Sequence, residues 1–311
     1  MPRLADATAI LIAGPTASGK SGLALSLAEK MGGVVINADS MQVYRELAIL
    51  TARPTAADIE RAPHVLYGFV SGAVAYSAGR YAADTAKAIA EAHAQARLPV
   101  IVGGTGLYFK ALLEGLSPVP AADPDVRAYW RGQAAHRPAP ELHALLAQRD
   151  PQMAGRLMPT DPQRIVRALE VLESTGRSLA DWQREPGMPV LAEHDAVRLL
   201  VLPDRHTVGL RIDARFDAML GEGAVEEVRR LLALGLSDEL PIMRALGVAQ
   251  LAAHVRGELQ LDVAATAAKT QTRQYAKRQA TWLRRNMRAW QAIQSQQMER
   301  ILAGDLSLID G

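Results

Sequence analysis

The chain of 311 residues carries 35 basic and 33 acidic side chains, and hydrophobic residues make up 49% of it. This composition excludes wholesale disorder and a fibrous repeat, and the length suits one large or two smaller domains. Because cysteine is absent, disulfides, cysteine-ligated metal sites and a thiol nucleophile are excluded. No segment has the pattern of a secretory signal or the roughly 18 apolar residues of a membrane span. We therefore expect a cytoplasmic protein without a membrane partner.

Short apolar runs alternate with helical patterns in the first third of the chain. Runs at 8–13, 34–36 and 99–102 are typical of strands buried on both faces, and 64–70 is a weaker candidate. A helical pattern follows the first run, and a long alanine-rich helix is expected over 77–96. This alternation predicts a parallel sheet with helices on both of its faces.

The pattern changes at a segment rich in helix and strand breakers, SPVPAADP at 117–124. From 125 to about 182 only helical patterns follow, and Asp-Pro pairs mark helix starts. The apolar run at 196–203 returns the chain to the sheet, and helical patterns extend from 204 to about 303. The chain is therefore expected to form an α/β core domain and an all-helical insertion domain. The predicted bounds are 1–118 and 190–311 for the core, and 119–189 for the insertion.

A phosphate-binding loop follows the first predicted strand. The segment matches the pattern G-x-x-x-x-G-K-[ST], with a strand before it and a helix after it. Backbone N–H groups and the helix N-terminus would surround an anion, and Lys20 would reach its outer oxygens. The hydroxyl of Ser21 is placed to coordinate Mg²⁺, the expected cofactor. The motif predicts a P-loop NTPase-like sheet that binds nucleotide or diphosphate through Gly14, Pro15, Thr16, Ala17, Ser18, Gly19, Lys20 and Ser21.

The acidic residue expected of a hydrolytic NTPase is missing from the later strand at 99–102, which runs into Gly103-Gly104-Thr105. An acid instead follows the second strand, at Asp39. Since ligands of open α/β sheets bind beyond the carboxyl ends of the strands, Asp39, Thr105 and the phosphate loop should share one crevice. Asp39 would there be a metal ligand or a general base, or alternatively the N-cap of a helix. Thr105 would donate its hydroxyl to a phosphate oxygen or cap the helix that begins near Gly106.

The near-neutral net charge conceals a concentrated basic segment at 269–288, which holds seven basic residues and no acidic one. The rest of the chain has 28 basic against 33 acidic residues, a net charge of −5. A solvated helix usually mixes both signs, so this run favours a phosphate-backbone partner. Arg164 and Arg167 form a second basic pair in the insertion. The expected apolar stripe of the helix is Ala276, Ala280, Leu283, Met287 and Trp290, and the basic residues are Lys269, Arg273, Lys277, Arg278, Arg284, Arg285 and Arg288.

Several motifs follow one another in a fixed order along most of the chain. They are GPTASGKS (14–21), NADSMQVY (37–44), TARP (51–54) with APH (62–64), VGGTGLYFKALLEGLSPVPAADPDVR (102–127), DPQRIVRALEV (161–171), RIDARFDAML (211–220), IMRALGV (242–248) and KRQATWLR (277–284). In this order the motifs resemble those of the bacterial tRNA dimethylallyltransferases, also called tRNA delta(2)-isopentenylpyrophosphate transferases.

The resemblance implies a prenyl transfer, in which the N6 amine of adenosine 37 in tRNA attacks the allylic carbon of dimethylallyl diphosphate. It implies that Asp39 is the general base and that Thr105 and Arg215 contact the diphosphate held by the phosphate loop. The helical insertion would clamp the anticodon stem-loop, and we expect a monomer. The residues that match tRNA-contacting positions of the family are Asp39, Ser40, Met41, Gln42, Thr105, Arg127, Gln163, Arg164, Ile165, Val166, Arg167, Arg244, Lys277, Arg278, Gln279, Trp282 and Arg284.

Three other functions fit parts of this pattern. A small-molecule kinase would also combine a phosphate loop with helices over it, but it leaves the basic helix without a role. An adenylate isopentenyltransferase would keep the prenyl chemistry and use free nucleotides, which leaves the insertion and the basic segment unexplained. An RNA-binding ATPase would need the carboxylate that the strand at 99–102 lacks.

Overall fold

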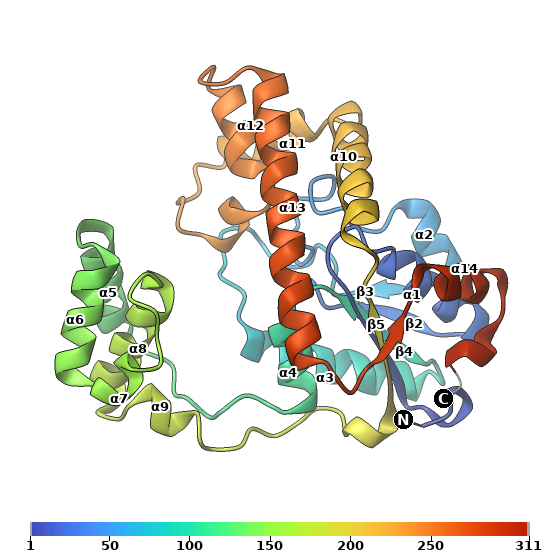
Figure 1. Cartoon of the computed structure of the whole chain (residues 1–311), viewed down its shortest axis with the longest axis horizontal. Helices are drawn as coiled ribbons and strands as arrows, with labels where there is room; N and C mark the ends of the chain where they lie inside the picture. The colour runs from blue at the N-terminus through green and yellow to red at the C-terminus, as the bar shows by residue number, and fades with distance from the viewer. Residues whose placement is uncertain (1, 310–311) are drawn as a thin grey trace. The chain divides into compact units, whose positions relative to one another are not determined.

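The computed structural model describes residues 2–309 and contains a six-stranded sheet in which every neighbouring pair of strands is parallel (Figure 1). The strand order is β3-β2-β4-β1-β5-β6. This arrangement confirms the predicted α/β class. The strands are β1 (Ala9–Ala13), β2 (Val34–Asn37), β3 (His64–Val65), β4 (Pro99–Gly103), β5 (Ala196–Val201) and β6 (Gln291–Ile293).

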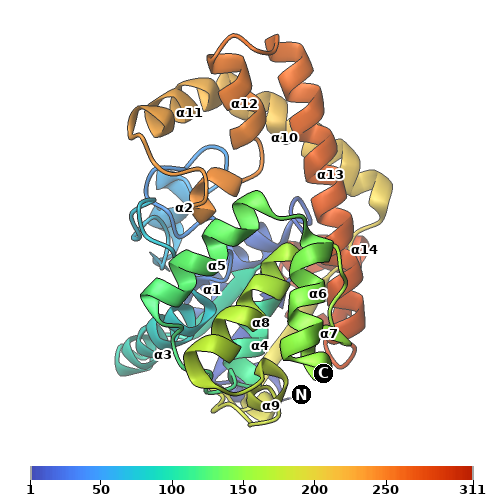
Figure 2. The ribbon, with the colours of Figure 1, turned by 90° about the vertical axis from the view of Figure 1, so that its left-hand side faces the viewer.

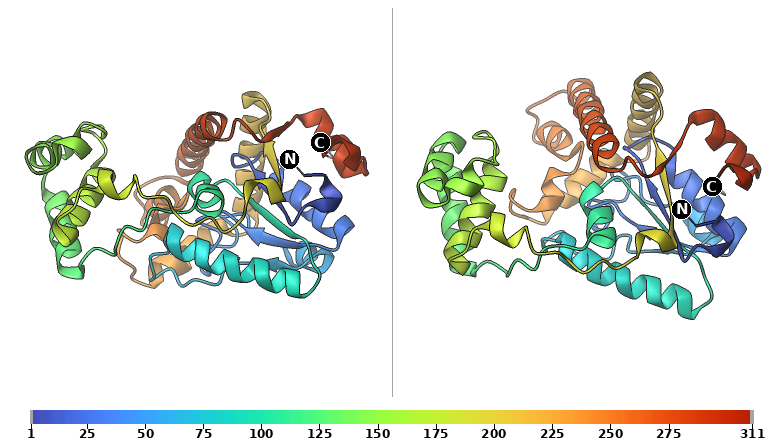
Figure 3. Two further views of the ribbon diagram at one scale, coloured as in Figure 1. Left: turned by 90° about the horizontal axis from the view of Figure 1, so that it is seen from below. Right: turned by 60° about the horizontal axis from the view of Figure 1, so that its bottom comes forward.

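Strand β1 lies in the middle of the sheet because its five residues are apolar and all are buried. Successive side chains point to opposite faces of a strand, so Ile10 and Ile12 pack in one hydrophobic cluster and Leu11 in another. The first cluster lies under α1 (Lys20–Met31) and α14 (Ser295–Ala303), and the second under α3 (Ala78–Ala94) and α4 (Gly106–Leu113). Figure 3 shows α3 running along its face of the sheet.

A second group of helices packs on the loop that follows β2. Phe216, Val228 and Leu251 share a hydrophobic cluster with Tyr44 and Leu47 of that loop. The longest helix of this group, α13, stands beside α10 in Figure 1. The helices are α10 (Arg205–Gly221), α11 (Ala224–Ala233), α12 (Val248–Val255) and α13 (Leu261–Asn286). A short helix, α2 (Ala56–Arg61), and four 3₁₀ turns, Leu4–Asp6, Glu193–Asp195, Pro241–Arg244 and Leu306–Ile309, complete the larger unit.

The helices between Glu114 and Pro189 form a separate compact unit with a core of its own. Trp130, Leu142 and Leu169 are buried in that core. Two of its helices begin at Asp-Pro pairs, where the aspartate caps the helix N-terminus. The side chain of Asp150 accepts a hydrogen bond from Met153 N at 2.9 Å, and that of Asp161 accepts one from Arg164 N at 3.2 Å. Figure 2 shows its helices, which are α5 (Pro124–His136), α6 (Ala139–Arg149), α7 (Pro151–Ala154), α8 (Pro162–Thr175) and α9 (Leu179–Trp182).

The chain leaves the larger unit after Leu113 and re-enters it at Val190. These two points are joined directly, because Val190 N and Leu191 N both donate hydrogen bonds to Leu112 O, at 2.8 and 3.0 Å. The smaller unit starts at Glu114 in the structure, where the sequence analysis places the start at 119.

Three expected elements differ from those observed. The segment 291–293, expected to be helical, forms β6, a strand too short for a recognisable pattern. The expected strand over 64–70 ends at Val65 because Leu66 adopts a left-handed conformation with φ of +64°. Helix α13 ends at Asn286, so Met287 and Trp290 are buried beyond the helix rather than on its face.

Within residues 2–309, no helix combines the length and the apolar character needed to cross a membrane.

Candidate active site

The phosphate loop connects β1 to α1 and has the backbone conformation of an anion-binding loop. Ala17 and Gly19 have left-handed conformations, with φ of +61° and +91°, which turn successive backbone N–H groups to one side. The first residue of the loop has to be glycine, because a Cβ at Gly14 would lie 2.7 Å from both Ser18 Oγ and Val201 O. The loop thus has the backbone geometry that the motif predicts.

Lys20 folds back over this loop, and its Nζ donates a hydrogen bond to Pro15 O at 3.2 Å. Burial lowers the pKa of the Lys20 amine to about 8. The nearby charge of Asp39 opposes this decrease, and the nearby charge of Arg215 adds to it. Two cationic side chains and one carboxylate therefore lie close enough to affect one another.

Asp39 follows β2 and is held through its backbone. Asp39 N donates to Asn37 Oδ1 at 2.8 Å, and Asn37 Nδ2 donates to Asp39 O at 3.0 Å. Asp39 Oδ1 accepts a hydrogen bond from Met41 N at 2.9 Å, which closes a turn. No helix begins at Asp39, since the next one along the chain is α2, so the interpretation as a helix N-cap is wrong. Within residues 2–309, Asp39 Oδ2 makes no hydrogen bond and remains available to a substrate.

Thr105 follows β4 and joins its loop to the turn that contains Asp39. Its Oγ1 accepts a hydrogen bond from Ser40 N at 3.0 Å and donates to Ser40 Oγ at 3.4 Å. Thr105 N donates to Ala38 O at 3.2 Å. The hydroxyl is thus bonded to the residue after Asp39 instead of to the first turn of α4. Because β2, β4 and β1 are neighbours in the sheet, Asp39, Thr105 and the phosphate loop lie at one edge, as expected.

Helix α10 brings two arginines to the phosphate loop. Arg215 Nη2 donates to Thr16 Oγ1 at 2.6 Å, and Arg211 Nη1 donates to Ser18 O at 3.2 Å. Burial lowers the pKa of the Arg215 guanidinium, and the charge of Asp39 acts in the opposite direction. Arg215 is predicted by the family resemblance, and Arg211 is not. The spacing of four residues, which puts both on one face of a helix, is the signal that could have indicated Arg211.

The other face of α10 is attached to α13 by two ion pairs. Lys269 Nζ lies 2.6 Å from Asp217 Oδ1, and Arg273 pairs with Asp213. Both pairs are partly exposed, so each contributes little to stability, but they orient α10 against α13. They also neutralise two of the seven cations of the basic segment.

Three tyrosines lie close enough to Asp39 for its charge to raise their pKa values. Burial raises the pKa values of Tyr67 and Tyr275, and the charge of Asp39 raises both further, that of Tyr275 to about 12. The pKa of Tyr108 is raised by burial, by Tyr81 and by Asp39, and its ring stacks on that of Tyr81 with centroids 3.7 Å apart. The sequence analysis does not include these residues, which lie far apart in the chain and have no local signature.

The outward face of α13 and the turn just after the helix carry the remaining positive charge of the basic segment. The side chains of Lys277, Arg278 and Arg284 are exposed, whereas Ala276 and Leu283 are buried. Within residues 2–309, none of these three cations makes an ion pair, and the same is true of Arg285 and Arg288. We call these five cations the basic face. A groove of about 530 Å³ runs along it, lined by Gln274, Lys277, Arg278, Thr281, Trp282 and Arg285.

The remaining candidates for tRNA contact differ in accessibility. In the helical unit, Arg127, Gln163 and Arg164 are exposed, but Ile165 and Val166 point into the core. Arg164 lies 3.3 Å from Asp161 and Arg167 lies 3.5 Å from Glu170, so both charges are shared with carboxylates. In the larger unit, Arg244 is exposed, Ser40 and Met41 are half-buried, and Gln279 is buried. The side chain of Gln42 is occupied within the protein, because its Nε2 donates hydrogen bonds to Thr51 O and Ala52 O, both at 2.9 Å.

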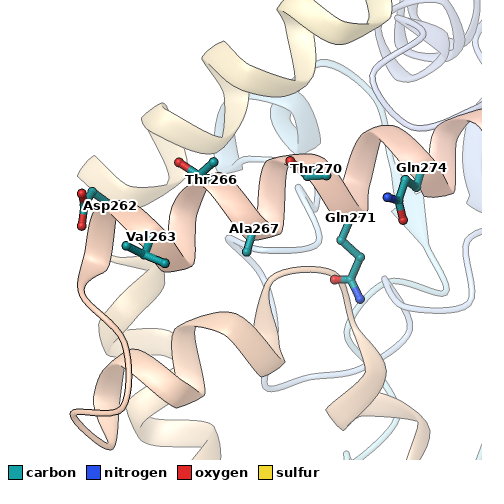
Figure 4. Close-up of a pocket in the computed structure, with 7 residues that line it drawn as sticks. All are labelled: Asp262, Val263, Thr266, Ala267, Thr270, Gln271 and Gln274. Carbon is teal, nitrogen blue, oxygen red and sulfur yellow. The ribbon is translucent and has the colours of Figure 1, made fainter.

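A second groove of about 530 Å³ lies along the N-terminal part of α13 (Figure 4). Asp262 is its one titratable residue, and neither the phosphate loop nor Asp39 contributes to it. The groove therefore lacks the charges that a phosphorylated substrate needs. The residues that line it are Asp262, Val263, Thr266, Ala267, Thr270, Gln271 and Gln274.

Few side chains near the phosphate loop can hold a metal ion. Within residues 2–309, no group of three or more histidines or carboxylates is placed to bind one. Ser21 is exposed in the first turn of α1. Mg²⁺ commonly binds through one or two protein oxygens together with substrate phosphates and water. The donors present therefore fit a Mg²⁺ ion that is bound mainly by a phosphorylated substrate.

The lowered pKa of Lys20 predicts that inorganic diphosphate binds more weakly above about pH 8. The amine is charged below its pKa and neutral above it, so at about pH 9 only about a tenth of the molecules keep the charge. We expect the affinity, measured calorimetrically and divided by that of a Lys20→Met variant, to fall up to about tenfold between about pH 7 and pH 9. The variant corrects for the titration of diphosphate itself. A ratio that does not change with pH would contradict the prediction.

The chain is similar in sequence to known proteins over nearly its whole length. The family model described as IPP transferase matches residues 42–287. A tRNA dimethylallyltransferase of Parvibaculum lavamentivorans is 51% identical and covers 97% of this chain and 96% of its own length. One from Nitrobacter hamburgensis is 56% identical, covering 90% of this chain and 89% of its own.

Solved structures are similar as well. The tRNA isopentenylpyrophosphate transferase of Bacillus halodurans has a TM-score of 0.68 and 29% identity, with 96% of each chain covered. A eukaryotic dimethylallyltransferase acting on tRNA has a TM-score of 0.75 and 28% identity, covering 88% of this chain and 69% of that one. Since the family model and the curated relatives agree over most of the chain, the protein belongs to the IPP transferase family.

Proposed function

We propose that this protein transfers the dimethylallyl group of dimethylallyl diphosphate to N6 of adenosine 37 in tRNA and releases diphosphate. The observation that carries the proposal is the meeting of the phosphate loop, Arg215 and the carboxylate of Asp39 at one edge of the sheet. A carboxylate repels a bound phosphate, so its presence there fits chemistry rather than binding. The names of the relatives supply the dimethylallyl group and the tRNA acceptor, and the family resemblance supplies the diphosphate donor and the position of the acceptor nitrogen.

In this reaction the phosphate loop holds a leaving group. As the bond between the allylic carbon and oxygen breaks, its electron pair goes to the diphosphate, whose negative charge increases. Lys20 and Arg215, which both lie at the loop, stabilise that charge. Mg²⁺, held by Ser21 and the diphosphate oxygens, would add positive charge at the same place.

Asp39 acts on the other substrate. The lone pair of an exocyclic adenine amine is delocalised into the ring, so the amine is a weak nucleophile. We assign to Asp39 the removal of one N6 proton as the new bond between nitrogen and carbon forms. Asp39 Oδ1 is held by Met41 N, which leaves Oδ2 to accept that proton. The adenine has to leave its stack to reach this edge of the sheet.

The basic face supports a polyanionic partner. Its cations are exposed and make no ion pair in the described part of the chain, whereas the other cations of the basic segment pair with Asp213 and Asp217. We propose that it binds the backbone of the anticodon stem-loop, and that Arg127 and Gln163 of the helical unit contribute contacts. We also propose a monomeric enzyme that acts where tRNA is processed, in the cytoplasm.

Incubation of the purified protein with labelled dimethylallyl diphosphate, Mg²⁺ and unmodified tRNA tests the proposal. We expect label at adenosine 37 and release of one diphosphate per label. Label in AMP but not in tRNA would identify an adenylate isopentenyltransferase. Consumption of ATP without label transfer would identify a kinase or an ATPase. Either of the last two results would contradict the proposed function.

Reversal of two charges on the basic face should weaken tRNA binding and its dependence on salt. Each phosphate contact contributes roughly 0.7 to 0.9 to the slope of log affinity against log salt concentration. We expect Lys277→Glu with Arg278→Glu to reduce the slope by about 1.5. The matched control reverses Lys87 on α3 and Arg230 on α11, two exposed cations off the basic face. Equal slopes for the two double variants, measured by filter binding, would show that the basic face is only solvated.

A further inference from the structure

Gln279 lies on the inner face of α13, where it is 8% exposed, and connects two loops of the site. Its Oε1 accepts a hydrogen bond from Thr16 N in the phosphate loop at 2.9 Å. Its Nε2 donates to Gly104 O, beyond β4, at 2.9 Å. Since one partner is a donor and the other an acceptor, a carboxamide satisfies both at once and does so in one orientation.

Two glycines allow α13 to approach the loop that carries Thr105. A Cβ at Gly104 would lie 2.3 Å from Gln279 Nε2, and one at Gly106 would lie 2.0 Å from the ring of Trp282. Gln279 and Trp282 are three residues apart on α13, so one face of the helix contacts the loop on both sides of Thr105. The hydrogen bonds of Gln279 are therefore part of a close contact between helix and loop.

We propose that Gln279 is a positioning residue, which holds the phosphate loop and the Thr105 loop at the spacing that diphosphate requires. This inference rests on the proposed function, in which the two loops bind the leaving diphosphate. The neighbours Lys277 and Arg278 point outward to the basic face, whereas Gln279 points inward. The side chain of Gln279 therefore acts on the diphosphate site and not on the RNA.

Loss of the carboxamide would leave the partly buried Thr16 N–H and the buried Gly104 C=O without a partner at this contact. Buried groups without partners are costly, so the two loops would move apart or admit water. Either change would have to be reversed when diphosphate binds, and the cost of that reordering lowers affinity. The RNA-facing side of α13 would keep its cations and its ion pairs to α10.

The first test is Gln279→Leu, with diphosphate and tRNA binding measured separately on the full-length protein. We expect the affinity for inorganic diphosphate to fall about tenfold, from the loss of one buried and one partly buried hydrogen bond. The affinity for tRNA should stay within about twofold, with an unchanged salt slope. Gln271→Leu is the matched control, because Gln271 lies on the same helix and makes no hydrogen bond in the described part of the chain (Figure 4). It should alter neither affinity.

The second test is Gln279→Glu, measured against pH. An ionised carboxyl accepts from Thr16 N–H but repels Gly104 O, whereas a protonated one can donate to Gly104 O. Burial raises the pKa of a carboxyl, so the introduced group becomes protonated as the pH falls toward about 6. We therefore expect the diphosphate affinity of this variant, divided by that of the wild type, to recover as the pH falls from about 8 to about 6. A purely structural defect would not recover in this way.

Three results would overturn the proposal. Loss of tRNA binding with diphosphate binding retained would make Gln279 an RNA contact. Parallel losses of both affinities together with a lower melting temperature would make its role structural. If the diphosphate affinity of Gln279→Glu, divided by that of the wild type, does not change with pH, the donor role of the carboxamide is excluded. Failure of the wild-type protein to prenylate tRNA would contradict the proposed function but leave the diphosphate comparison intact.

Discussion

Replacement of Asp39 by asparagine is expected to reduce the rate of dimethylallyl transfer by about 10²- to 10⁴-fold, the usual contribution of a general base. Asparagine keeps an oxygen for the hydrogen bond from Met41 N, so the turn after β2 should persist. The amide cannot accept the proton of N6, and the amine then has to attack with its proton in place. Single-turnover measurements, with the enzyme in excess over labelled dimethylallyl diphosphate and with saturating tRNA, would report this chemical step without product release.

The binding data for the same variant separate catalysis from structure. Asp39→Asn removes a negative charge close to Lys20 and Arg215, so the affinity for inorganic diphosphate should stay equal or increase. The affinity for tRNA should change little. Loss of both affinities would mean that Asp39 mainly maintains the loop. A transfer rate near that of the wild type would exclude it as the base.

Replacement of Arg215 by glutamine is the second change with a large expected effect. Arg215 reaches the phosphate loop through Thr16 Oγ1 and is the half-buried cation of α10 at this site. Removing one preorganised group that stabilises developing charge typically costs about 10²- to 10³-fold in rate. We expect that loss in kcat, with a smaller change in the KM for dimethylallyl diphosphate, because the charge on the diphosphate is greatest in the transition state.

Arg211→Gln provides the matched comparison for Arg215→Gln. Arg211 comes from the same face of α10 but donates to the backbone oxygen of Ser18, and its side chain is more exposed. A backbone contact of this kind should affect the shape of the loop more than the charge next to the diphosphate. We therefore expect less than about a tenfold loss of rate for Arg211→Gln. Equal losses in the two variants would argue against a specific role for Arg215.

The central strands and the phosphate loop could be predicted from the sequence because their signals are local. The run Ala9–Ala13 is apolar at every position, as a strand covered on both faces must be. The loop motif needs only the adjoining strand and helix. The proximity of Asp39 and Thr105 could be predicted from one topological rule, that the carboxyl ends of neighbouring parallel strands lie on the same side of the sheet. Their proposed roles came from the family resemblance and await the experiments above.

Features that depend on contacts between distant segments could not be predicted. Nothing local in the sequence places Tyr67 and Tyr275 beside Asp39, since they come from a loop and from α13. Gln279 belongs to a segment whose composition favours RNA binding, yet packing turns its side chain inward. The charge of Lys269 likewise belongs to the basic run, but Asp217 of α10 neutralises it. Charge counted along the chain differs from charge at the surface.

The hydrogen bonds from Val190 N and Leu191 N to Leu112 O allow the helical unit to evolve independently of the sheet. These bonds hold together the two points at which the chain leaves the larger unit and returns to it. The sheet and its loops therefore do not depend on the length of the helical unit between those points. Insertions, deletions or replacement of segments in the helical unit leave the backbone of the larger unit unaltered, as for domains inserted at closely spaced termini. The helical unit can therefore change in length and sequence while the loops at the strand ends keep their geometry.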